Sequence, residues 1–392
     1  MEYKARLKRN IFLFNLTSFF TALVFLIPIW VNFERRIVSY SVIAIYTAVA
    51  SVSTTVLELP TGALADLLGR KKTIFIGYLI NGLATAFLSL ASLPVHLYLG
   101  YGLISIGSAL VSGADTALLF DSLKELGEEK NFSKYFSVMG LVHRSALGLA
   151  SLLGGYLYQI WIGLPYLAHG VSLLIATLIF GLMQEPKIDT EKFSLNTYIT
   201  QTKIGFNEIL KNTHIKLLSA YYVLVGSITW ACIFYFNQPF ALEVGFNEIS
   251  RSWVFSATYF ITSIVLILLT RSEKLLTRKR VYLSLPIIIG LALIPANFSG
   301  KIYGAIILLL TQLTGSARFA ILNEYTNLEF QSRYRATAIS ALNMLVSIVS
   351  GAFIFFGGQV QEAVGTGLIY TVLGVFTLIT VFPVAFKLIN NS

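Results

Sequence analysis

The stretch ELPTGALADLLGRKK, from Glu58 to Lys72, places a dense group of charges in a long apolar region. Asp66 stands near the end of an apolar run that is long enough to be a membrane helix, and residues 70–72 are three consecutive cations. An acid at the C-terminal end of a helix is disfavoured by the helix dipole, so Asp66 needs a cationic partner. Gly69 permits the turn that brings the cations back. The stretch therefore predicts ion pairs that tie helices and a loop together.

The rest of the chain indicates an all-α membrane protein. Of its 392 residues, 56% are hydrophobic and 12% are charged, whereas a soluble domain is about 25% charged. Apolar runs of roughly 20 residues, the length that crosses a bilayer, recur along the whole sequence. We predict 12 transmembrane helices, at about 10–33, 41–66, 73–92, 96–121, 135–159, 163–184, 214–240, 250–271, 281–298, 302–326, 335–359 and 362–386. The basic start precedes an apolar stretch too long for a signal peptide, so we expect a retained first span.

The distribution of cations predicts the orientation of these spans. Most of the 29 lysines and arginines fall in loops on the side of the N-terminus, and only Arg35, Arg36, Arg251 and Lys301 fall in loops on the other side. By the positive-inside rule, we expect both termini to be cytoplasmic in a multi-pass protein of the plasma membrane. The cations form short patches without interleaved aromatic residues, so no nucleic-acid partner is expected. Cys232 is the single cysteine, which excludes an internal disulfide.

The two halves of the chain resemble each other. Residues 114–121 match residues 317–324 at an offset of 203, and residues 67–71 match residues 275–279 at an offset of 208. We therefore predict two pseudo-symmetric six-helix bundles, residues 1–184 and 214–392, the arrangement that secondary transporters use around a midplane site. The cytoplasmic linker between them, residues 185–213, has apolar residues at helical spacing: Leu195, Tyr198, Ile199, Phe206, Ile209 and Leu210. They predict an amphipathic helix that lies on the membrane or packs on the bundle.

The segment from Gly62 to Lys72 resembles the signature of the major facilitator superfamily, Gly-x-Leu-Ala-Asp-Arg-x-Gly-Arg-Lys, with Leu67 in place of the first arginine. This resemblance implies the major facilitator fold and a conformational latch at the cytoplasmic ends of the helices. The latch residues that it implies are Gly62, Asp66, Gly69, Arg70, Lys71 and Asp121. In it, Arg70 pairs with Asp121, and Asp66 faces the start of span 11. The second half carries Lys274 and Thr277 at the positions of Asp66 and Gly69, so we do not expect the same latch there.

A second segment, Ala146 to Gly155, resembles the span-5 motif of the drug:proton antiporter branch, which has 12 helices. Two of its glycines match, and Ser151 replaces its proline. The segment indicates either antiport or plain helix packing through small residues. The glycines that we assign to packing are Gly148, Gly154 and Gly155, with their repeat partners Gly351, Gly357 and Gly358.

Charged residues inside the spans are functional candidates, because a charge in the bilayer costs about 2.5 to 3.5 kcal/mol on insertion scales. Glu58, Asp115 and Arg144 fall within roughly 9 to 15 Å of the inner ends of their spans. We hypothesise that Arg144 pairs with Asp115 or Glu58 and that protonation of the carboxylate drives alternating access; a permanently neutralised structural pair is the alternative. Arg318 has no acid within a turn. It either binds an anionic or zwitterionic substrate or extends toward the membrane surface.

Other polar and aromatic positions on the spans are candidates for a cavity wall, which would suit a partly apolar ligand; packing and interface anchoring are the alternatives. These candidates, with Arg318, are Asn15, Thr21, Trp230, Tyr235, Asn237, Gln238, Tyr259 and Asn343.

The motif search favours a transporter over an enzyme. The chain has no phosphate-binding Gly-x-x-x-x-Gly-Lys-Ser/Thr loop, no His-Glu-x-x-His and no Gly-x-Ser-x-Gly, so we expect no catalytic residues, no cofactor and no metal. The leading prediction is a secondary active transporter that exports small amphipathic or drug-like molecules by proton-coupled alternating access. The alternatives are an importer of a small organic anion or zwitterion and, from another class, a lipid flippase or a non-transporting receptor. The expected partners are the lipid bilayer, a small-molecule substrate and protons, and the resemblance implies a monomer.

Overall fold

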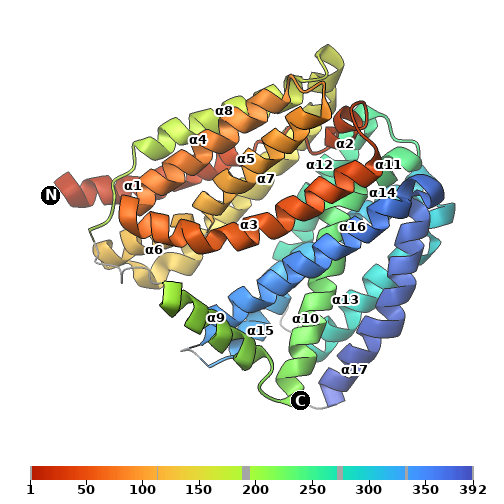
Figure 1. Ribbon diagram of the computed structural model, residues 1–392. Helices are drawn as coiled ribbons and strands as arrows, with labels where there is room; N and C mark the ends of the chain where they lie inside the picture. The colour runs from red at the N-terminus through yellow and green to blue at the C-terminus, as the bar shows by residue number, and fades with distance from the viewer. Residues whose placement is uncertain (1, 113, 188–194, 272–276, 332–333, 391–392) are drawn as a thin grey trace. The chain divides into compact units, whose positions relative to one another are not determined.

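The structure is a computed structural model that describes residues 2–112, 114–187, 195–271, 277–331 and 334–390. The side chains of residues 2, 58–68, 195–198, 270 and 336 are outside this description. The predictions for Glu58, Gly62 and Asp66 fall among these side chains and stay predictions. Every regular element in the described ranges is helical (Figure 1). The expected all-α class is therefore confirmed.

The first half of the chain forms helices close to the predicted spans (Figure 1). They are α1 (Glu2–Thr21), α2 (Trp30–Glu34), α3 (Tyr40–Leu68), α4 (Arg70–Leu88), α5 (Pro94–Val111), α6 (Ala114–Leu126), η1 (Glu129–Asn131), α7 (Phe132–Ile160) and α8 (Leu164–Gly181). Two predicted spans differ, because the first is interrupted between α1 and α2 and the fourth between α5 and α6. The second interruption starts a new helix at Ala114, one residue before the functional candidate Asp115.

The second half contains more interruptions than the first. Its elements are α9 (Leu195–Ile209), α10 (Thr213–Ala231), η2 (Cys232–Phe236), α11 (Asn237–Glu243), α12 (Glu248–Thr270), α13 (Arg278–Leu293), η3 (Ile294–Phe298), α14 (Lys301–Ala317), η4 (Arg318–Leu322), α15 (Asn323–Glu329), α16 (Arg335–Phe376), η5 (Thr377–Val381) and α17 (Phe382–Asn390). Three of these, η2, η4 and η5, are single π-helical segments inside longer helices. Such π-helical segments are frequent at functional sites.

A glycine separates the last two predicted spans. Gly365 lies inside α16 with φ +79° and ψ 162°, which is not a helical conformation. The Glu243 carboxylate accepts hydrogen bonds from the backbone N–H groups of Thr366 (2.5 Å) and Gly367 (3.1 Å) and so begins the next helical run. The sequence predicted this boundary a few residues earlier.

Nine stretches of the described chain are long and apolar enough to cross a membrane. One of them, Thr337–Asn390, contains the last two predicted spans. The helices α1 and α4, which correspond to predicted spans 1 and 3, are not among the nine; α4 begins with three cations. The nine stretches therefore contain ten of the twelve predicted spans, and α1 and α4 correspond to the other two.

Contacts divide the chain into two compact units. Unit 1 comprises Met1–Ile37, Ser53–Leu195 and Glu248–Ser256, and unit 2 comprises Val38–Val52, Asn196–Asn247 and Ala257–Ser392. The start of α3 thus packs within unit 2, and the start of α12 packs within unit 1. The predicted bundle limits at residues 184 and 214 stay a prediction.

Glycines allow close helix contacts inside each unit. A Cβ at Gly154 would lie 2.1 Å from the Phe25 carbonyl oxygen, and one at Gly155 would lie 2.3 Å from the Glu248 carbonyl oxygen. In unit 2, a Cβ at Gly358 would lie 2.0 Å from the Ala44 Cβ. A Cβ at Gly357 would lie 2.6 Å from the Phe236 ring, and one at Gly351 would lie 3.3 Å from the Val52 side chain. Gly148 is buried. These contacts agree with a packing role; antiport remains a prediction for the motif.

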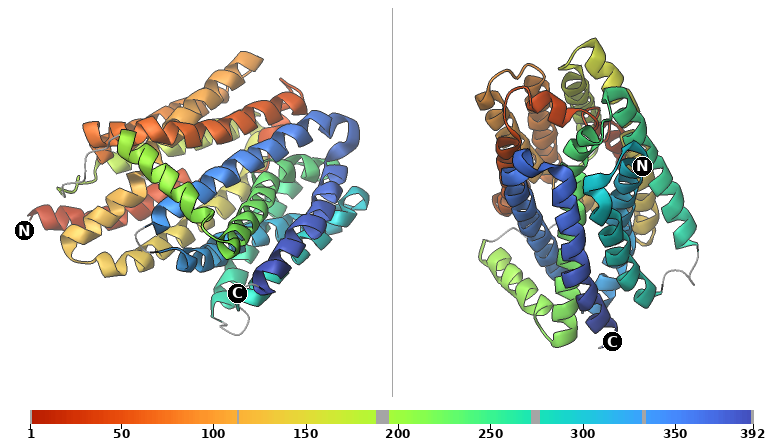
Figure 2. Two further views of the ribbon diagram at one scale, coloured as in Figure 1. Left: turned by 60° about the horizontal axis from the view of Figure 1, so that its bottom comes forward. Right: turned by 90° about the vertical axis from the view of Figure 1, so that its right-hand side faces the viewer.

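The predicted amphipathic helix corresponds to α9, beside the start of α10 (Figure 2). Its Ile209 is buried, and the Ile209 carbonyl accepts a hydrogen bond from Ser219 Oγ (3.0 Å). Ile199 and Leu210 are exposed. The helix therefore packs on unit 2 through one face and leaves apolar side chains uncovered on another.

Candidate functional site

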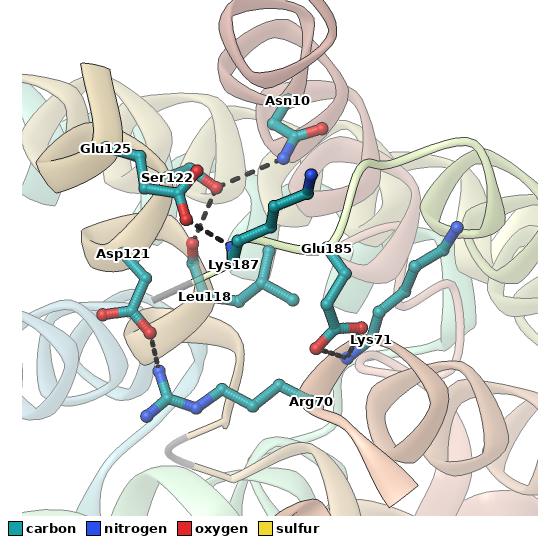
Figure 3. A network of polar contacts seen from close by, with 9 residues as sticks. All are labelled: Asn10, Arg70, Lys71, Leu118, Asp121, Ser122, Glu125, Glu185 and Lys187. Atoms are coloured by element: carbon teal, nitrogen blue, oxygen red, sulfur yellow. Dashed lines mark hydrogen bonds and ion pairs between the residues drawn. The ribbon is translucent and has the colours of Figure 1, made fainter. Parts of the chain in front are cut away.

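A polar network joins four segments at one end of unit 1 (Figure 3). The segments are the beginning of α1, the beginning of α4, the end of α6 and the chain that follows α8. An apolar cluster lies in the same region of the unit, and it includes Phe14, Ile74, Leu119, Leu123 and Phe180 from the same four helices. The packing of this cluster holds the four helix ends in place, so the polar groups above it have defined partners.

The central contact is the ion pair between Arg70 and Asp121, which the resemblance implies and the structure contains (Figure 3). Arg70 occupies the first position of α4, and Asp121 lies in the last turns of α6. The two side chains are 23% and 14% exposed. A charge pair at this depth is screened less by water and salt than a surface pair. It therefore links α4 to α6 more firmly than an exposed ion pair would.

Glu185 completes the start of α4. Its two carboxylate oxygens accept hydrogen bonds from the backbone N–H of Lys71 at 3.2 and 3.1 Å (Figure 3). The first N–H groups of a helix have no partner inside the helix, and the positive end of the dipole favours an anion there. Gly69 has φ +91°, and a Cβ at this position would lie 3.4 Å from the Glu185 carboxylate. The positive φ therefore favours glycine here, whereas the carboxylate would leave room for a Cβ.

Glu125 binds both the N-terminal helix and the segment after α8. It accepts a hydrogen bond from the Tyr3 hydroxyl (2.5 Å) and another from the backbone N–H of Lys187. The Lys187 ammonium lies 4.8 Å from the centre of the Tyr3 ring. Burial, followed by the hydrogen bond to Glu125, raises the pKa of Tyr3 to about 12, so this hydroxyl stays protonated and continues to donate at any physiological pH.

The side-chain amide of Asn10 in α1 connects this helix to α6 and to the chain after α8. Asn10 is fully buried; its Nδ2 donates to Ser122 Oγ (3.2 Å) and to the Gln184 carbonyl (2.8 Å), and its Oδ1 accepts from the Gln184 N–H (2.9 Å). Ser122 in turn donates to the Leu118 carbonyl (2.8 Å). We call Asn10, Arg70, Asp121, Ser122, Glu125 and Glu185 the first clasp. The sequence identified Arg70 and Asp121 but not the other members, whose partners are distant along the chain.

Unit 2 contains a corresponding ion pair, between Arg278 and Glu329. Arg278 is the first residue of α13 and Glu329 the last of α15. Both ion pairs join residues 51 positions apart, and each member of the second pair follows its counterpart by 208 positions. The expectation that the second half has no such latch is wrong for this contact, because the pair needs neither an acid at position 274 nor a glycine at position 277. Lys274 itself lies outside the described residues.

The second pair has its own surroundings. His214 Nε2 lies 3.5 Å from the other Glu329 oxygen, and the Arg278 guanidinium lies 5.8 Å from the centre of the Tyr325 ring. The Arg278 side chain is 48% exposed and that of Glu329 is 21% exposed. We call Arg278, Glu329 and His214 the second clasp.

The offset of 208 also changes the repeat partner of Asp115. At this offset Asp115 corresponds to Asn323, whereas at the offset of 203 it corresponds to Arg318.

The structure does not bring Arg144 and Asp115 together. Asp115 accepts hydrogen bonds from the N–H (2.6 Å) and the hydroxyl (3.2 Å) of Thr116 at the start of α6. Arg144 is half-buried in α7 and forms no ion pair with any acid whose side chain the structure describes. A pair of Arg144 with Glu58 stays a prediction, since the Glu58 side chain lies outside the description. The role of these residues in proton coupling also stays a prediction.

Arg318 and Asn343, two of the cavity candidates, do meet in unit 2. The Arg318 guanidinium Nη2 lies 3.4 Å from Asn343 Oδ1 and its carbon lies 4.3 Å from the centre of the Tyr222 ring. Arg318 is 3% exposed, so it does not extend to the surface. Tyr222 was missed by the sequence reasoning, because tyrosines are common in this chain and none of its neighbours in sequence marks it.

Most other cavity candidates are engaged in internal contacts. Asn237 accepts from Tyr370 (2.6 Å) and Thr311 (3.2 Å), and Tyr235 donates to Gln361 (2.9 Å). The remaining contacts are Asn15 Nδ2 to the Ile11 carbonyl (2.9 Å), Thr21 to the Ser18 carbonyl (3.2 Å), and Trp230 stacked on Phe234 at 5.5 Å; Gln238 is buried and Tyr259 is half-buried. A substrate role for each of them stays a prediction.

Two charged residues near helix ends of unit 1 are buried. Arg251 is fully buried, and it donates to Asn32 Oδ1 (2.5 Å) and lies 3.6 Å from Glu248. Glu34 is also fully buried and accepts hydrogen bonds from the hydroxyls of Tyr101 (2.5 Å) and Tyr166 (2.7 Å). Arg251, counted among the cations on the outer side, lies in the first turn of α12, which begins at Glu248, and it packs within unit 1.

Comparisons with known proteins agree with this architecture. The chain is 23% identical to YxaM, an uncharacterized MFS-type transporter of Bacillus subtilis (strain 168), over 90% of this chain and 89% of that protein. It is 22% identical to the multidrug resistance protein MdtH of Salmonella arizonae, over 76% of this chain and 71% of that protein.

Solved structures show the same fold. The nucleoside transporter NupG superposes with a TM-score of 0.74 at 14% identity, over 100% of this chain and 99% of that chain. A bacterial homologue of the human lysosomal transporter Spinster superposes with a TM-score of 0.73 at 15% identity, over 100% and 97%. The sequence pattern of the Major Facilitator Superfamily matches residues 11–355. The chain therefore belongs to the major facilitator superfamily, whose members are membrane transporters and not enzymes.

Proposed function

We propose that this transporter is a secondary active exporter of small amphipathic or drug-like molecules, which works by proton-coupled alternating access. The observation that carries the alternating-access part is the repetition of the clasp. Each unit has an ion pair between the start of one helix and the end of another, at equivalent positions of the repeat. We propose that both clasps face the cytoplasm of the cell, as the positive-inside rule favours.

Partly exposed ion pairs suit a latch that must open and close. A fully buried pair would need several kcal/mol to separate, and a fully exposed pair would contribute little. The exposures of Arg70 and Asp121, 23% and 14%, lie between these extremes. Their separation therefore has a free-energy cost that substrate or proton binding can supply.

Export and proton coupling are supported by other observations. MdtH is named a multidrug resistance protein, which supports export of drug-like molecules here. Asp115 is half-buried, carries no ion pair with any described cation, and begins a helix after an interruption. We propose that this carboxylate takes up the coupling proton, with Glu58 as the second candidate.

Import of a small organic anion or zwitterion is the second candidate function. It is favoured by Arg318, a buried cation that forms no ion pair with any described carboxylate. The two candidates share the same scaffold and differ in the direction of net transport.

Transport by purified protein in proteoliposomes separates the candidates. A proton gradient of either sign is imposed, and a panel of labelled dyes, drugs and organic acids is followed. Proton-coupled export predicts substrate movement against the direction of the proton flux, and movement in the same direction supports proton-coupled import. Asp115→Asn and Glu58→Gln are compared with the exposed variant Arg36→Gln. Unchanged dependence on the gradient in both acidic variants would remove these residues from coupling, and no substrate movement at all would contradict the proposed transport.

A further inference from the structure

The surroundings of Arg318 contain more hydrogen-bond donors than acceptors. Arg318 begins the π-helical segment η4, and a guanidinium carries five N–H groups. Its one hydrogen bond among the described residues is the 3.4 Å contact with Asn343, and its buried Nε has no partner. No described aspartate or glutamate pairs with it. A buried positive charge with so few acceptors is unfavourable unless an anion joins it.

The neighbouring amides do not supply the missing acceptors. Asn323 and Asn343 both present Oδ1 to the Tyr222 hydroxyl, at 3.3 and 3.1 Å. Their Nδ2 groups donate to no acceptor within the described ranges, so they add further donors to the group. The combination of a guanidinium and two carboxamides matches the planar, bidentate geometry of a carboxylate.

The packing around Arg318 fixes the position of its guanidinium. A Cβ at Gly226 would lie 2.9 Å from the guanidinium carbon and from Nη2, so a larger residue there would displace the cation. The Tyr222 ring lies under the guanidinium at 4.3 Å and is itself buried. Asn343, in contrast, is exposed, so one side of the group is open to a ligand.

We propose that Arg318, Tyr222, Asn323 and Asn343 form a binding site for the carboxylate group of a small amphipathic substrate. In this site the guanidinium binds the carboxylate oxygens, the carboxamides donate further hydrogen bonds, and the ring of Tyr222 holds the guanidinium in place from below. The inference rests on the proposed transport function and names the substrate class, organic acids and amino-acid-like zwitterions.

The test measures binding and does not depend on transport. Full-length protein in detergent is titrated by calorimetry with matched pairs of ligands: naphthoate, octanoate and N-acetyltryptophan, each beside its neutral carboxamide. We expect at least one acid to bind about tenfold or more tightly than its amide, the difference that a charge-assisted hydrogen-bonded pair provides. Arg318→Gln is expected to abolish this preference while leaving the affinity for the amide unchanged, and Arg318→Lys is expected to retain part of it.

Arg36→Gln removes one exposed positive charge and serves as the charge-matched control, and circular dichroism checks that each variant is folded. The proposal is overturned if every acid binds no better than its amide, or if Arg318→Gln keeps the preference. If the preference depends on Arg318 but proteoliposomes move no substrate, the carboxylate site stands and the proposed transport fails. If proteoliposomes move substrate but no preference for an acid depends on Arg318, the proposed transport stands and the carboxylate site fails.

Discussion

The two clasps use the same ion pair in different surroundings. In the first clasp, Arg70 and Asp121 are 23% and 14% exposed, and neighbouring hydrogen bonds are accepted by Glu185 and Glu125 and donated by Asn10. In the second clasp, Arg278 and Glu329 are 48% and 21% exposed, and His214 is the additional ionisable partner. The repeat has kept the positions of the charges, and the units differ in how many other segments are attached to them.

This difference predicts that the two clasps contribute unequally to stability. In the first clasp the chain after α8 supplies Glu185, which binds the start of α4 directly. In the second clasp the corresponding helix, α13, begins at Arg278, and the side chain of its N-cap residue Thr277 forms no capping hydrogen bond. We therefore expect the first clasp to contribute more to the stability of unit 1 than the second clasp contributes to unit 2, and the second clasp to open more easily.

The largest effect is expected from Asp121→Asn, which leaves the Arg70 guanidinium half-buried without its anion. We expect a loss of about 1–3 kcal/mol, below the range for fully buried pairs, and a lower rate of transport. Thermal unfolding in detergent, followed by tryptophan fluorescence, measures the stability. The exchange of the two residues, Arg70→Asp with Asp121→Arg, should recover part of the loss. A double variant no more stable than the single ones would refute a direct pair.

A smaller effect is expected from Glu185→Ala, which removes the acceptor for the Lys71 N–H. Loss of an N-terminal capping group costs roughly 0.5–2 kcal/mol. Glu185→Gln keeps an acceptor oxygen and should lose less. Thr277→Ala, at the equivalent end of α13, is the matched control and should change nothing, because Thr277 forms no capping hydrogen bond. The same melting measurement applies, and equal losses for Glu185→Ala and Thr277→Ala would contradict the unequal clasps.

The smallest effect is expected from Arg278→Gln. An exposed ion pair contributes about 0.2–1 kcal/mol, and salt screens it. The difference in melting temperature from the unmodified protein should therefore disappear at about 1 M salt, whereas the effect of Asp121→Asn should persist. Lys279→Gln removes an exposed neighbouring cation as the control. A loss for Arg278→Gln as large and as salt-resistant as that for Asp121→Asn would show that the two clasps are equivalent.

Two members of the first clasp were predictable, because the signature of the major facilitator superfamily implies the pair of Arg70 with Asp121 and a local signal accompanies it. Gly69, Arg70 and the cations that follow lie within a few residues of the acid that needs them, and helix-end electrostatics requires a partner for each. Glu185 was not predictable in this way, since it lies 114 positions from Lys71 in the sequence. The Arg278–Glu329 pair carries a detectable signal, the offset of 208 that relates it to Arg70 and Asp121, but the competing match of residues 114–121 with residues 317–324 at an offset of 203 conceals it.

The sequence alone determined that this protein is a helical membrane transporter of the major facilitator superfamily. The length of each apolar run, the short charged connections and the signature between spans 2 and 3 are properties of adjacent residues, and the bilayer requires such runs to be helical. The tertiary structure decided which charges meet. Arg318 faces Tyr222 and Asn343 across three helices, and Arg144 lies apart from Asp115. These outcomes depend on the rotation of each helix about its axis, which interruptions and π-helical segments change by part of a turn; an apolar sequence restricts that rotation only weakly.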